Sequence, residues 1–281
     1  MYLKKNNFLQ PFLKWAGGKR QLLPELLCRV PKRMQTYYEP FVGGGALFFA
    51  LQPKKAVIND FNRDLIHTYE VIRDDVDSLL QLLSSYKNDV NFYYKIRELD
   101  RNPRLFKKLS AVEKGARIIY LNKTCYNGLF RVNSAGEFNS PFGYYKNPNI
   151  INEAVLKAVS TYLNTADINL MCGDFSSAVK SAKKGDFVYF DPPYDPVSQS
   201  SNFTGYTSIG FDKEEQIRLK KLCDELNKRG VKFLLSNSAT PFILDLYKDY
   251  HIDIIPAKRI INSNASLRGV VDEVLISNYE T

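Results

Sequence analysis

Short, mostly apolar runs are separated by turns between residues 37 and 60 of the chain. Tyr37–Val42 is followed by three glycines at 43–45 and then by the apolar segment Ala46–Leu51. A second short run, Ala56–Asp60, ends on a carboxylate. A strand, a glycine turn, a buried helix and a second strand that ends on an acid are typical of the opening unit of a doubly wound α/β sheet.

From about Asp64 to Lys123 the apolar residues recur at helical spacing instead. Positions 65, 66, 69 and 72 form one such face, and no strand-like run interrupts the segment. The segment that follows, Cys125–Gly143, has two asparagine-rich turns and alternating side chains. This pattern predicts a hairpin or an extended loop.

Short apolar runs return after about Asn152, and with them the α/β pattern. We therefore expect one α/β domain, residues 1–63 and 151–281, interrupted by a mostly helical insert at 64–150. Two polar stretches, Ser198–Gly210 and Asn262–Gly269, are expected to be mobile. The predicted strands are Ile168–Cys172, Phe187–Phe190, Val231–Leu235 and segments near His251–Ile255 and Val270–Ile276, and the predicted helices are Phe175–Ala182 and Glu214–Lys228.

The charge of the chain is unevenly distributed. The 281 residues carry 39 Lys and Arg against 30 Asp and Glu, a formal charge of +9. Residues 1–55 hold 10 basic and 2 acidic side chains, residues 56–100 hold 5 and 9, and residues 101–149 hold 9 and 2. Two basic blocks suit a polyanion that touches two regions brought together by the fold. Lysine-rich solvated surfaces would give the same pattern. Charge alone therefore does not decide between a polyanion partner and an ordinary solvated surface.

Composition excludes several classes of protein. With 44% hydrophobic and 25% charged residues, the chain resembles an ordinary soluble protein. Its four cysteines form no Cys-x-x-Cys pair and it has two histidines, which argues against a metal site, a redox motif or a Ser-His triad. We expect Cys125 and Cys172 to be buried structural residues. No apolar run approaches the roughly 18 residues of a membrane span, and no signal peptide is evident, so we expect a cytoplasmic protein that does not bind membranes.

Two glycine-containing segments suggest a ligand pocket. The triplet that begins at Gly43 departs from the dinucleotide fingerprint because Phe48 stands where the last glycine belongs. Asp60 follows Gly43 by 17 residues at a strand end, where a carboxylate can accept both hydroxyls of a ribose. In the segment that begins at Trp15, Arg20 replaces the Ser or Thr of a phosphate-binding loop. An NTPase is therefore disfavoured, whereas an adenosine or amino-acid pocket remains open.

The segment Asp191-Pro192-Pro193-Tyr194 comes directly after the predicted strand Phe187–Phe190. Two prolines remove two backbone donors and stiffen the turn, so that carbonyl groups point outward as acceptors. Asp191 adds a carboxylate and Tyr194 adds a flat aromatic face. This combination suits an exocyclic amine, because it offers acceptors for the amine hydrogens and a platform for the ring that bears the amine.

With these motifs in their observed order, the chain resembles the DNA adenine-N6 methyltransferases of the Dam type. The resemblance implies a Rossmann-like α/β sheet that uses S-adenosylmethionine and carries a mostly helical target-recognition insert. The segments that carry it are Phe12-Leu13-Lys14-Trp15-Ala16-Gly17-Gly18-Lys19, Glu39-Pro40-Phe41-Val42-Gly43-Gly44-Gly45, Asn59-Asp60, Tyr126-Asn127-Gly128-Leu129-Phe130-Arg131, Gly136-Glu137-Phe138-Asn139, Asp191-Pro192-Pro193-Tyr194 and Asn202-Phe203-Thr204.

The resemblance also implies roles for single residues in catalysis and cofactor binding. Tyr194 would stack on a target adenine rotated out of the duplex, while Asp191 and the carbonyl of Pro192 accept from N6. Methyl transfer would be a direct in-line displacement, with no metal and no covalent enzyme intermediate. Core packing is otherwise the better explanation for Phe175. The implied cofactor-binding residues are Trp15, Ala16, Gly17, Lys19, Phe41, Gly43, Asp60, Asp174, Phe175 and Asp191.

DNA recognition is assigned by the resemblance to the insert and to Lys14. Arg131 would contact a guanine edge, Leu129 a thymine methyl group, and Lys14 the first guanine of GATC. The other implied DNA-binding residues are Tyr126 as a wedge and Asn127 and Asn133 at phosphates. One departure is Tyr144, which stands where some relatives have Arg. Arg268, within Asn262–Gly269, is a weaker candidate for a backbone clamp.

The expected partner is double-stranded DNA. The sequence leaves two cases open: an orphan methyltransferase, or a member of a restriction–modification pair with a cognate restriction endonuclease that acts separately on the same site. Two alternatives remain open. Methyltransferases of RNA or of protein amides share the fold, although they commonly carry Asn in place of Asp191 and lack this insert. A catalytically silent DNA-binding module would not need the cofactor motifs or an intact Asp191-Pro192-Pro193-Tyr194 segment, which we call the tetrad.

Overall fold

The computed structural model describes residues 5–19, 21–196, 211–258 and 270–280. The two polar stretches that were expected to be mobile, Ser198–Gly210 and Asn262–Gly269, lie outside these ranges. The Asn202-Phe203-Thr204 motif and Arg268 therefore lie outside the described residues as well.

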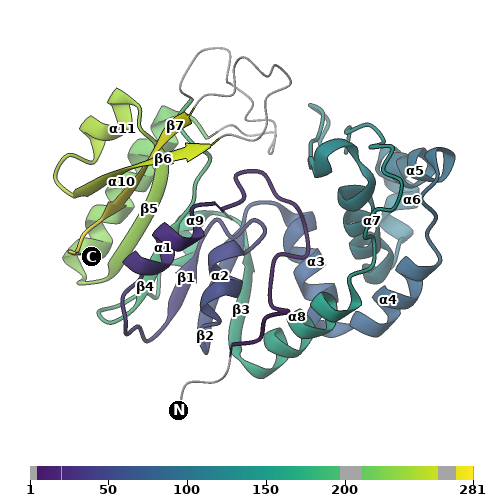
Figure 1. Cartoon of the computed structure of the whole chain (residues 1–281), viewed down its shortest axis with the longest axis horizontal. Coiled ribbons are helices and arrows are strands. Elements are labelled where there is room, and N and C mark those ends of the chain that lie inside the picture. Colours follow the sequence, from purple (N-terminus) through teal and green to yellow (C-terminus); the bar gives the residue numbers. More distant parts are fainter. Residues whose placement is uncertain (1–4, 20, 197–210, 259–269, 281) are drawn as a thin grey trace.

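The described residues contain one sheet of seven strands in the order β3-β2-β1-β4-β5-β7-β6 (Figure 1). The first five strands of this order are parallel to one another, and β7 is antiparallel to both β5 and β6. The expected α/β class is thus confirmed. The strands are β1 (Tyr37–Glu39), β2 (Lys55–Asp60), β3 (Asp167–Cys172), β4 (Phe187–Phe190), β5 (Lys232–Ser238), β6 (His251–Lys258) and β7 (Val270–Ser277).

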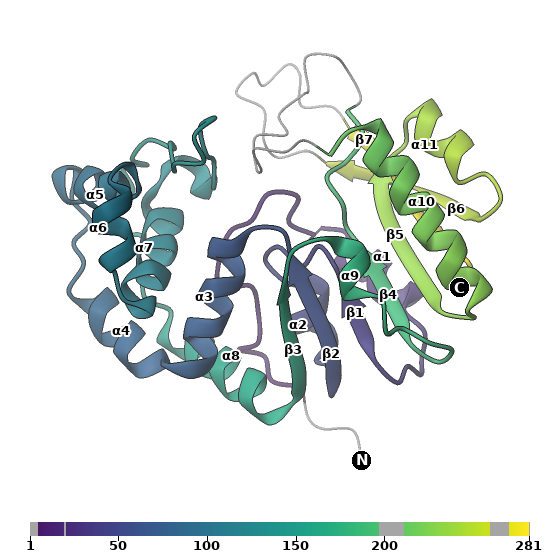
Figure 2. The same cartoon turned by 180° about the vertical axis from the view of Figure 1, so that it is seen from behind.

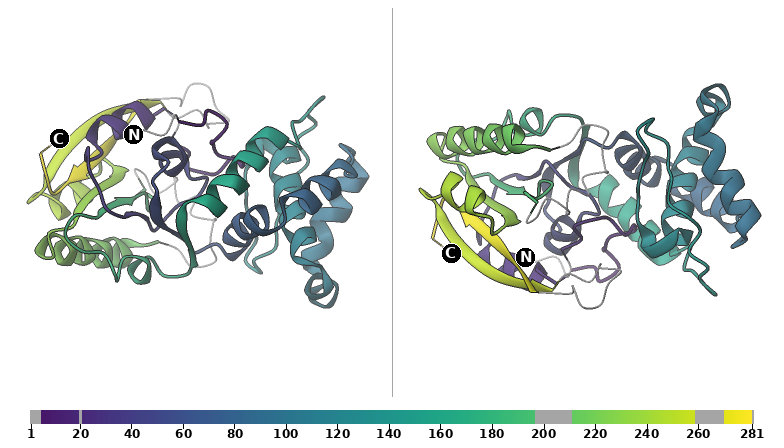
Figure 3. Two further views of the ribbon diagram at one scale, coloured as in Figure 1. Left: turned by 90° about the horizontal axis from the view of Figure 1, so that it is seen from below. Right: turned by 90° about the horizontal axis from the view of Figure 1, so that it is seen from above.

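Alternating side chains along the strands build one apolar core on each face of the sheet. Tyr37 and Tyr189 belong to one buried cluster, whereas their neighbours Tyr38 and Val188 belong to the other. Helices cover both faces, and in the views of Figure 3 the dark purple α1 and the green α10 lie on opposite sides. The helices beside the sheet are α1 (Leu23–Arg29), α2 (Ala46–Leu51), α9 (Phe175–Ala178), α10 (Lys213–Lys228) and α11 (Pro241–Leu246).

Residues 64–150, the predicted insert, contain a group of helices beside the β3 edge of the sheet. Helix α3, the first of them, lies between the sheet and the other helices (Figure 2). Side-chain caps begin these helices, as where Asp75 accepts from the backbone N–H of Ser78 and where Ser110 and Glu113 form a capping box. The helices of this group and their neighbours are α3 (Arg63–Asp74), α4 (Val76–Ser84), α5 (Val90–Arg97), η1 (Glu98–Arg101), α6 (Pro103–Lys108), α7 (Ala111–Thr124), η2 (Tyr126–Gly128) and α8 (Glu153–Thr165).

Several elements differ from the sequence-based expectation. Helix α9 ends at Ala178 rather than at residue 182, whereas β5 continues three residues further, to Ser238. The segment after α7 is held by two isolated antiparallel bridges, Cys125 to Phe142 and Val132 to Phe138, rather than by a continuous ladder. The expectation that Cys172 is buried was wrong. Cys172 is exposed because it ends β3, which is the edge strand, whereas Cys125 is buried as expected.

Candidate active site at the carboxyl edge of the sheet

The predicted site residues lie on loops that leave the carboxyl ends of adjacent parallel strands. In an open parallel sheet this edge is where ligands bind. Asn59, at the end of β2, ties three of these loops together. Its side-chain amide donates to the carbonyl of Pro40 at 2.9 Å and to that of Gly173 at 3.0 Å. The backbone carbonyl of Asn59 accepts from the backbone N–H of Val42 at 2.8 Å.

Asp60 lies against the glycine turn that follows β1. Its Oδ2 accepts from the backbone N–H of Gly43 at 3.0 Å, and its Oδ1 accepts from that of Asn62 at 2.9 Å. Burial nevertheless raises the pKa of Asp60 to about 6. Gly43 has a φ of +48°, and a Cβ there would lie 2.8 Å from Cδ1 of Trp15. Only glycine therefore allows Trp15 to pack this closely on the turn.

The structure brings Phe41 and Phe175 together and adds Arg218, which sequence reasoning missed. The two phenylalanine rings have centroids 5.2 Å apart, and the Arg218 guanidinium lies 4.0 Å from the centroid of Phe175. Arg218 also pairs with both oxygens of Asp174, at 2.6 and 3.1 Å, and holds the pKa of that carboxyl down at about 2. Nothing in the charged repeat of α10 marks Arg218 in the sequence, because its partner lies 44 residues away.

Asp191 is held by two side chains from other parts of the chain. The Lys19 ammonium lies 2.8 Å from Oδ1, and the Ser236 hydroxyl donates to the same oxygen at 2.8 Å. Burial raises the pKa of Asp191, while Lys19 and Ser236 favour its ionised form. Lys19 Nζ also donates to the carbonyl of Gly17 at 2.6 Å and lies 4.7 Å from the ring centroid of Tyr194.

The turn at 191–195 is supported from behind by α10 and β5. Gln216 donates to the carbonyl of Pro193 at 2.9 Å, and Asn237 donates to Gln216 at 3.1 Å and accepts from the backbone N–H of Asp195 at 3.0 Å. Within the described ranges no donor to the carbonyl of Pro192 is recorded. Among the described residues the predicted acceptor thus keeps its lone pairs, while the next carbonyl, that of Pro193, accepts from Gln216.

Tyr194 and the polar end of β5 complete the tetrad. The Tyr194 hydroxyl donates to Glu273 on β7 at 2.8 Å, which fixes the ring beside Asp191. Sequence reasoning missed Ser236, Asn237 and Glu273. A signal was present for the first two, because polar residues that directly continue the apolar strand Val231–Leu235 lie at the same carboxyl edge as Asp191.

The predicted DNA-binding residues of the insert all lie on the loop after α7. Tyr126 is 56% exposed and Arg131 is exposed, with its Nε donating to the side chain of Asn139 at 2.7 Å. Leu129 is half-buried and Asn127 is exposed with a φ of +56°. Asn133 is engaged within its own turn, where its amide donates to Glu137 at 2.8 Å. Lys14 lies against this loop and is described further below.

A family comparison agrees with this arrangement. The profile of the D12 class of N6 adenine-specific DNA methyltransferases matches residues 15–261, from the Trp15 segment to beyond the tetrad. The chain belongs to this family. It is an adenine-specific DNA methyltransferase, as the tetrad and the glycine turn had indicated.

Similar proteins cover nearly the whole methyltransferase. The chain is 47% identical over 280 residues to the type II methyltransferase M1.LlaDCHI of Lactococcus lactis subsp. cremoris, covering 99% of this chain and 98% of that protein. It is 44% identical to the type II methyltransferase M.MjaIII of Methanocaldococcus jannaschii, covering 96% and 99%. It is 34% identical to the DNA adenine methylase of Escherichia coli strain K12, covering 97% and 95%.

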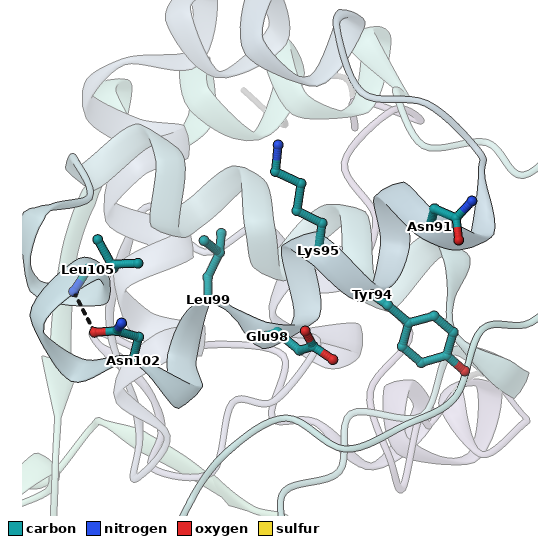
Figure 4. A pocket seen from close by; sticks show the side chains of 7 residues that line it. All are labelled: Asn91, Tyr94, Lys95, Glu98, Leu99, Asn102 and Leu105. Carbon is teal, nitrogen blue, oxygen red and sulfur yellow. Dashed lines mark hydrogen bonds between the residues drawn. The ribbon is translucent and has the colours of Figure 1, made fainter.

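A groove of about 510 Å³ lies elsewhere on the methyltransferase, on α5, η1 and α6 of the insert (Figure 4). The groove is lined by Asn91, Tyr94, Lys95, Glu98, Leu99, Asn102 and Leu105, and none of the predicted site residues is among them.

No helix in the described part of the chain is both long and apolar enough to cross a membrane. The same residues contain no group of three or more His, Cys, Asp or Glu side chains placed to hold a metal ion.

Proposed function

We propose that this methyltransferase transfers a methyl group from S-adenosylmethionine to N6 of the adenine in GATC within double-stranded DNA. One observation carries the proposal. Lys19 forms an ion pair with Asp191 of the tetrad. Trp15, four residues before Lys19, packs on Gly43, and the backbone N–H of Gly43 donates to Asp60. The proposed cofactor loops and the proposed reacting group therefore meet at one edge of the sheet.

The residues at this edge fit S-adenosylmethionine. Asp60 keeps lone pairs for ribose hydroxyls, and its two backbone donors fix the orientation of the carboxylate. A Cβ placed on Gly173 would meet nothing within 4 Å, so there is open space at Gly173, the residue before Asp174. S-adenosylmethionine supplies the electrophilic methyl group when it is bound. The residues that we assign to it are Trp15, Ala16, Gly17, Lys19, Phe41, Gly43, Asp60, Asp174, Phe175 and Asp191.

The tetrad is proposed to hold the target amine. An adenine inside a duplex is out of reach, so the base has to rotate out of the stack. Lys19 and Ser236 both bind Oδ1 of Asp191, and no described residue donates to the carbonyl of Pro192. Asp191 and Pro192 can therefore accept the two N6 hydrogens while the base stacks on Tyr194. This arrangement orients the nitrogen lone pair for direct in-line transfer, and positioning and electrostatics supply the catalysis.

The loop after α7 is proposed to recognise the DNA sequence. Arg131 is exposed and has the donors for a bidentate contact to guanine, and Tyr126 is exposed enough to fill the gap left by the rotated base. Leu129 would contact a thymine methyl group and Lys14 the first guanine. Asn127 and Asn133 would contact phosphates. The relatives named as type II methyltransferases also support the proposal that a separate restriction endonuclease acts on the same site.

Methyl transfer to two duplexes tests this function. One duplex contains a single GATC, and the other has its adenine replaced. We expect label from S-adenosylmethionine on N6 of the GATC adenine alone, and no label with Asp191→Ala. Label on both duplexes would refute GATC recognition by Arg131 and Leu129. Label on a transcript of the same sequence in place of the duplex would establish the RNA alternative.

A further inference from the structure

Asn122, on α7 of the insert, joins three segments of the chain through one side chain. It is 1% exposed. Its Oδ1 accepts from the backbone N–H of Lys14 at 2.9 Å, and its Nδ2 donates to the carbonyls of Lys14 at 2.8 Å and of Gly128 at 3.1 Å. The insert is thus hydrogen-bonded both to the N-terminal segment and to its own recognition loop.

Two packing contacts reinforce these bonds. The rings of Trp15 and Phe130 stack with centroids 4.9 Å apart and an interplanar angle of 28°. Gly128 has a φ of +65°, and a Cβ there would lie 2.6 Å from Cδ of Lys14. The loop can approach the N-terminal segment this closely only because residue 128 is glycine. We call Lys14, Trp15, Asn122, Gly128 and Phe130 the joint.

The joint lies between the proposed cofactor site and the proposed recognition residues. On one side, Trp15 packs on Gly43, whose N–H binds Asp60. On the other side, Gly128 and Phe130 flank Leu129 in the loop. A change in the position of Trp15 on cofactor binding would therefore be transmitted directly to the loop, through a stacked ring and without an intervening mobile segment.

We propose that Asn122 is a positioning residue and that the joint couples cofactor binding to DNA recognition. The inference rests on the proposed function of Asp60 and of the loop after α7. A cofactor that fixes Trp15 also fixes Phe130 and the loop, so DNA meets a surface that is already ordered. By thermodynamic linkage, DNA then raises cofactor affinity by the same factor.

The coupling can be measured with S-adenosylhomocysteine, which has no methyl group to transfer. The affinity of a fluorescein-labelled GATC duplex is measured by anisotropy with and without this probe. The ratio of the two dissociation constants is the coupling factor, expected to be about 5- to 150-fold in the wild type. Trp15 is the one tryptophan of the sequence, so its emission reports the joint directly and should respond to both ligands.

The variants are Asn122→Ala and Phe130→Leu, each expected to lower the coupling factor toward 1. Tyr93→Phe is the matched control. The change removes the 2.8 Å hydrogen bond that the buried Tyr93 hydroxyl donates to the carbonyl of Ser140. That bond holds the loop after α7 to α5 and does not involve the N-terminal segment. Tyr93→Phe should keep the wild-type factor. A loss of stability alone would not lower this ratio, because S-adenosylhomocysteine stabilises the folded state and so offsets the loss in the arm that contains it.

An unchanged coupling factor in folded Phe130→Leu, checked by its melting curve, would refute the joint even if Asn122→Ala fails to fold. An equal loss of coupling in Tyr93→Phe would refute it as well. Failure of the proposed function gives a different result, because the wild type would then methylate no GATC duplex. A wild type that methylates GATC with a coupling factor of 1 would overturn the coupling alone.

Discussion

Three carboxylates at one edge of the sheet differ in protonation because their surroundings differ. Burial raises the pKa of Asp60 to about 6, whereas Arg218 holds the pKa of Asp174 down at about 2. Burial also raises the pKa of Asp191 above its usual range. Asp174 is thus ionised at every pH at which the protein would be assayed, whereas Asp60 titrates just below neutrality.

Cofactor affinity should depend on pH through Asp60. Only the ionised carboxylate can accept both ribose hydroxyls, and with a pKa of about 6 it is almost fully ionised at pH 8. Lowering the pH to 5 leaves roughly one tenth ionised. We therefore expect S-adenosylhomocysteine to bind the wild type about tenfold more weakly at pH 5 than at pH 8. Calorimetric titration of Asp60→Asn should show weak binding with no such change, and parallel profiles would contradict the assignment.

Glu39 should make stability fall as the pH rises. It is 2% exposed at the end of β1, where Tyr37 donates to it at 2.6 Å, and burial raises its pKa to about 8. In the unfolded chain the pKa is lower, so the folded state binds the proton more tightly. The contribution of Glu39 to stability is therefore fully present below about pH 4.5 and is lost progressively up to about pH 8.

The variant Glu39→Gln tests this titration, because the amide oxygen can still accept from Tyr37. Between pH 5 and pH 8.5 the free energy of unfolding of the wild type should fall relative to the variant by at least about 1 kcal/mol, since one unit of pKa corresponds to about 1.4 kcal/mol. Urea denaturation at both pH values measures the difference. A constant difference would show that Glu39 does not titrate in this range.

At the scale of elements, the sequence predicted best where the apolar pattern was continuous. Strand β4 was predicted at its observed bounds, and α10 to within one residue, because a short buried run and a long amphipathic repeat are unambiguous. The sequence analysis did not predict α1, α8 or α11. Helices α1 and α11 have seven and six residues, too few for a repeating face to stand out.

The positions of the site loops were predictable, but several of their partners were not. Strand ends of a parallel sheet meet at one edge, so Asp60 and Asp191 could be placed near each other from the sequence. Arg218, Gln216 and Asn122 act on residues 23 to 108 positions away, and their choice of partner is decided by tertiary packing. No local pattern distinguishes them from other polar side chains on helices.

The support of the proposed catalytic turn at 191–195 by α10 predicts the effect of Gln216→Leu. The change leaves the carbonyl of Pro193 and the amide of Asn237 without their buried partner, which should cost about 1–3 kcal/mol of stability. Displacement of the turn should lower kcat about tenfold or more, with little change in KM for the cofactor. Steady-state kinetics test this.

The matched control is Asn278→Leu, at the opposite end of β5. Asn278 accepts from Phe233 N at 2.9 Å and donates to the carbonyl of Val231 at 2.9 Å. Its loss should lower stability to a similar degree while kcat stays unchanged. If both variants lose kcat in proportion to stability, the support of the turn has no specific catalytic role.

At the scale of the whole molecule, the fold brings the two basic blocks of the sequence together. Lys14 belongs to the first block and Arg131 to the second, and the joint places their segments in direct contact. The sheet and the helical insert lie side by side in Figure 1. Trp15 contacts both the glycine turn at the carboxyl edge of the sheet and Phe130 in the loop after α7. A single polyanion can therefore touch both blocks.

DNA affinity should accordingly depend strongly on salt. The logarithm of the dissociation constant is expected to rise linearly with the logarithm of the salt concentration, with a slope of about 0.9 for each phosphate contacted. Six contacts would weaken binding by about a thousandfold between 50 and 200 mM salt. Anisotropy titrations over this range measure the slope, and a dissociation constant independent of salt would show that the basic blocks do not contact the backbone.

The most direct test of the central claim is a map of N6-methyladenine in DNA modified by this protein. The chain is expressed in a host that lacks adenine methylation, and its plasmid DNA is sequenced by a method that detects the modified base. We expect N6-methyladenine in both strands of every GATC and at no other sequence, and none with Asp191→Ala. Methylation at another sequence, or methylation that persists in the variant, would contradict the account.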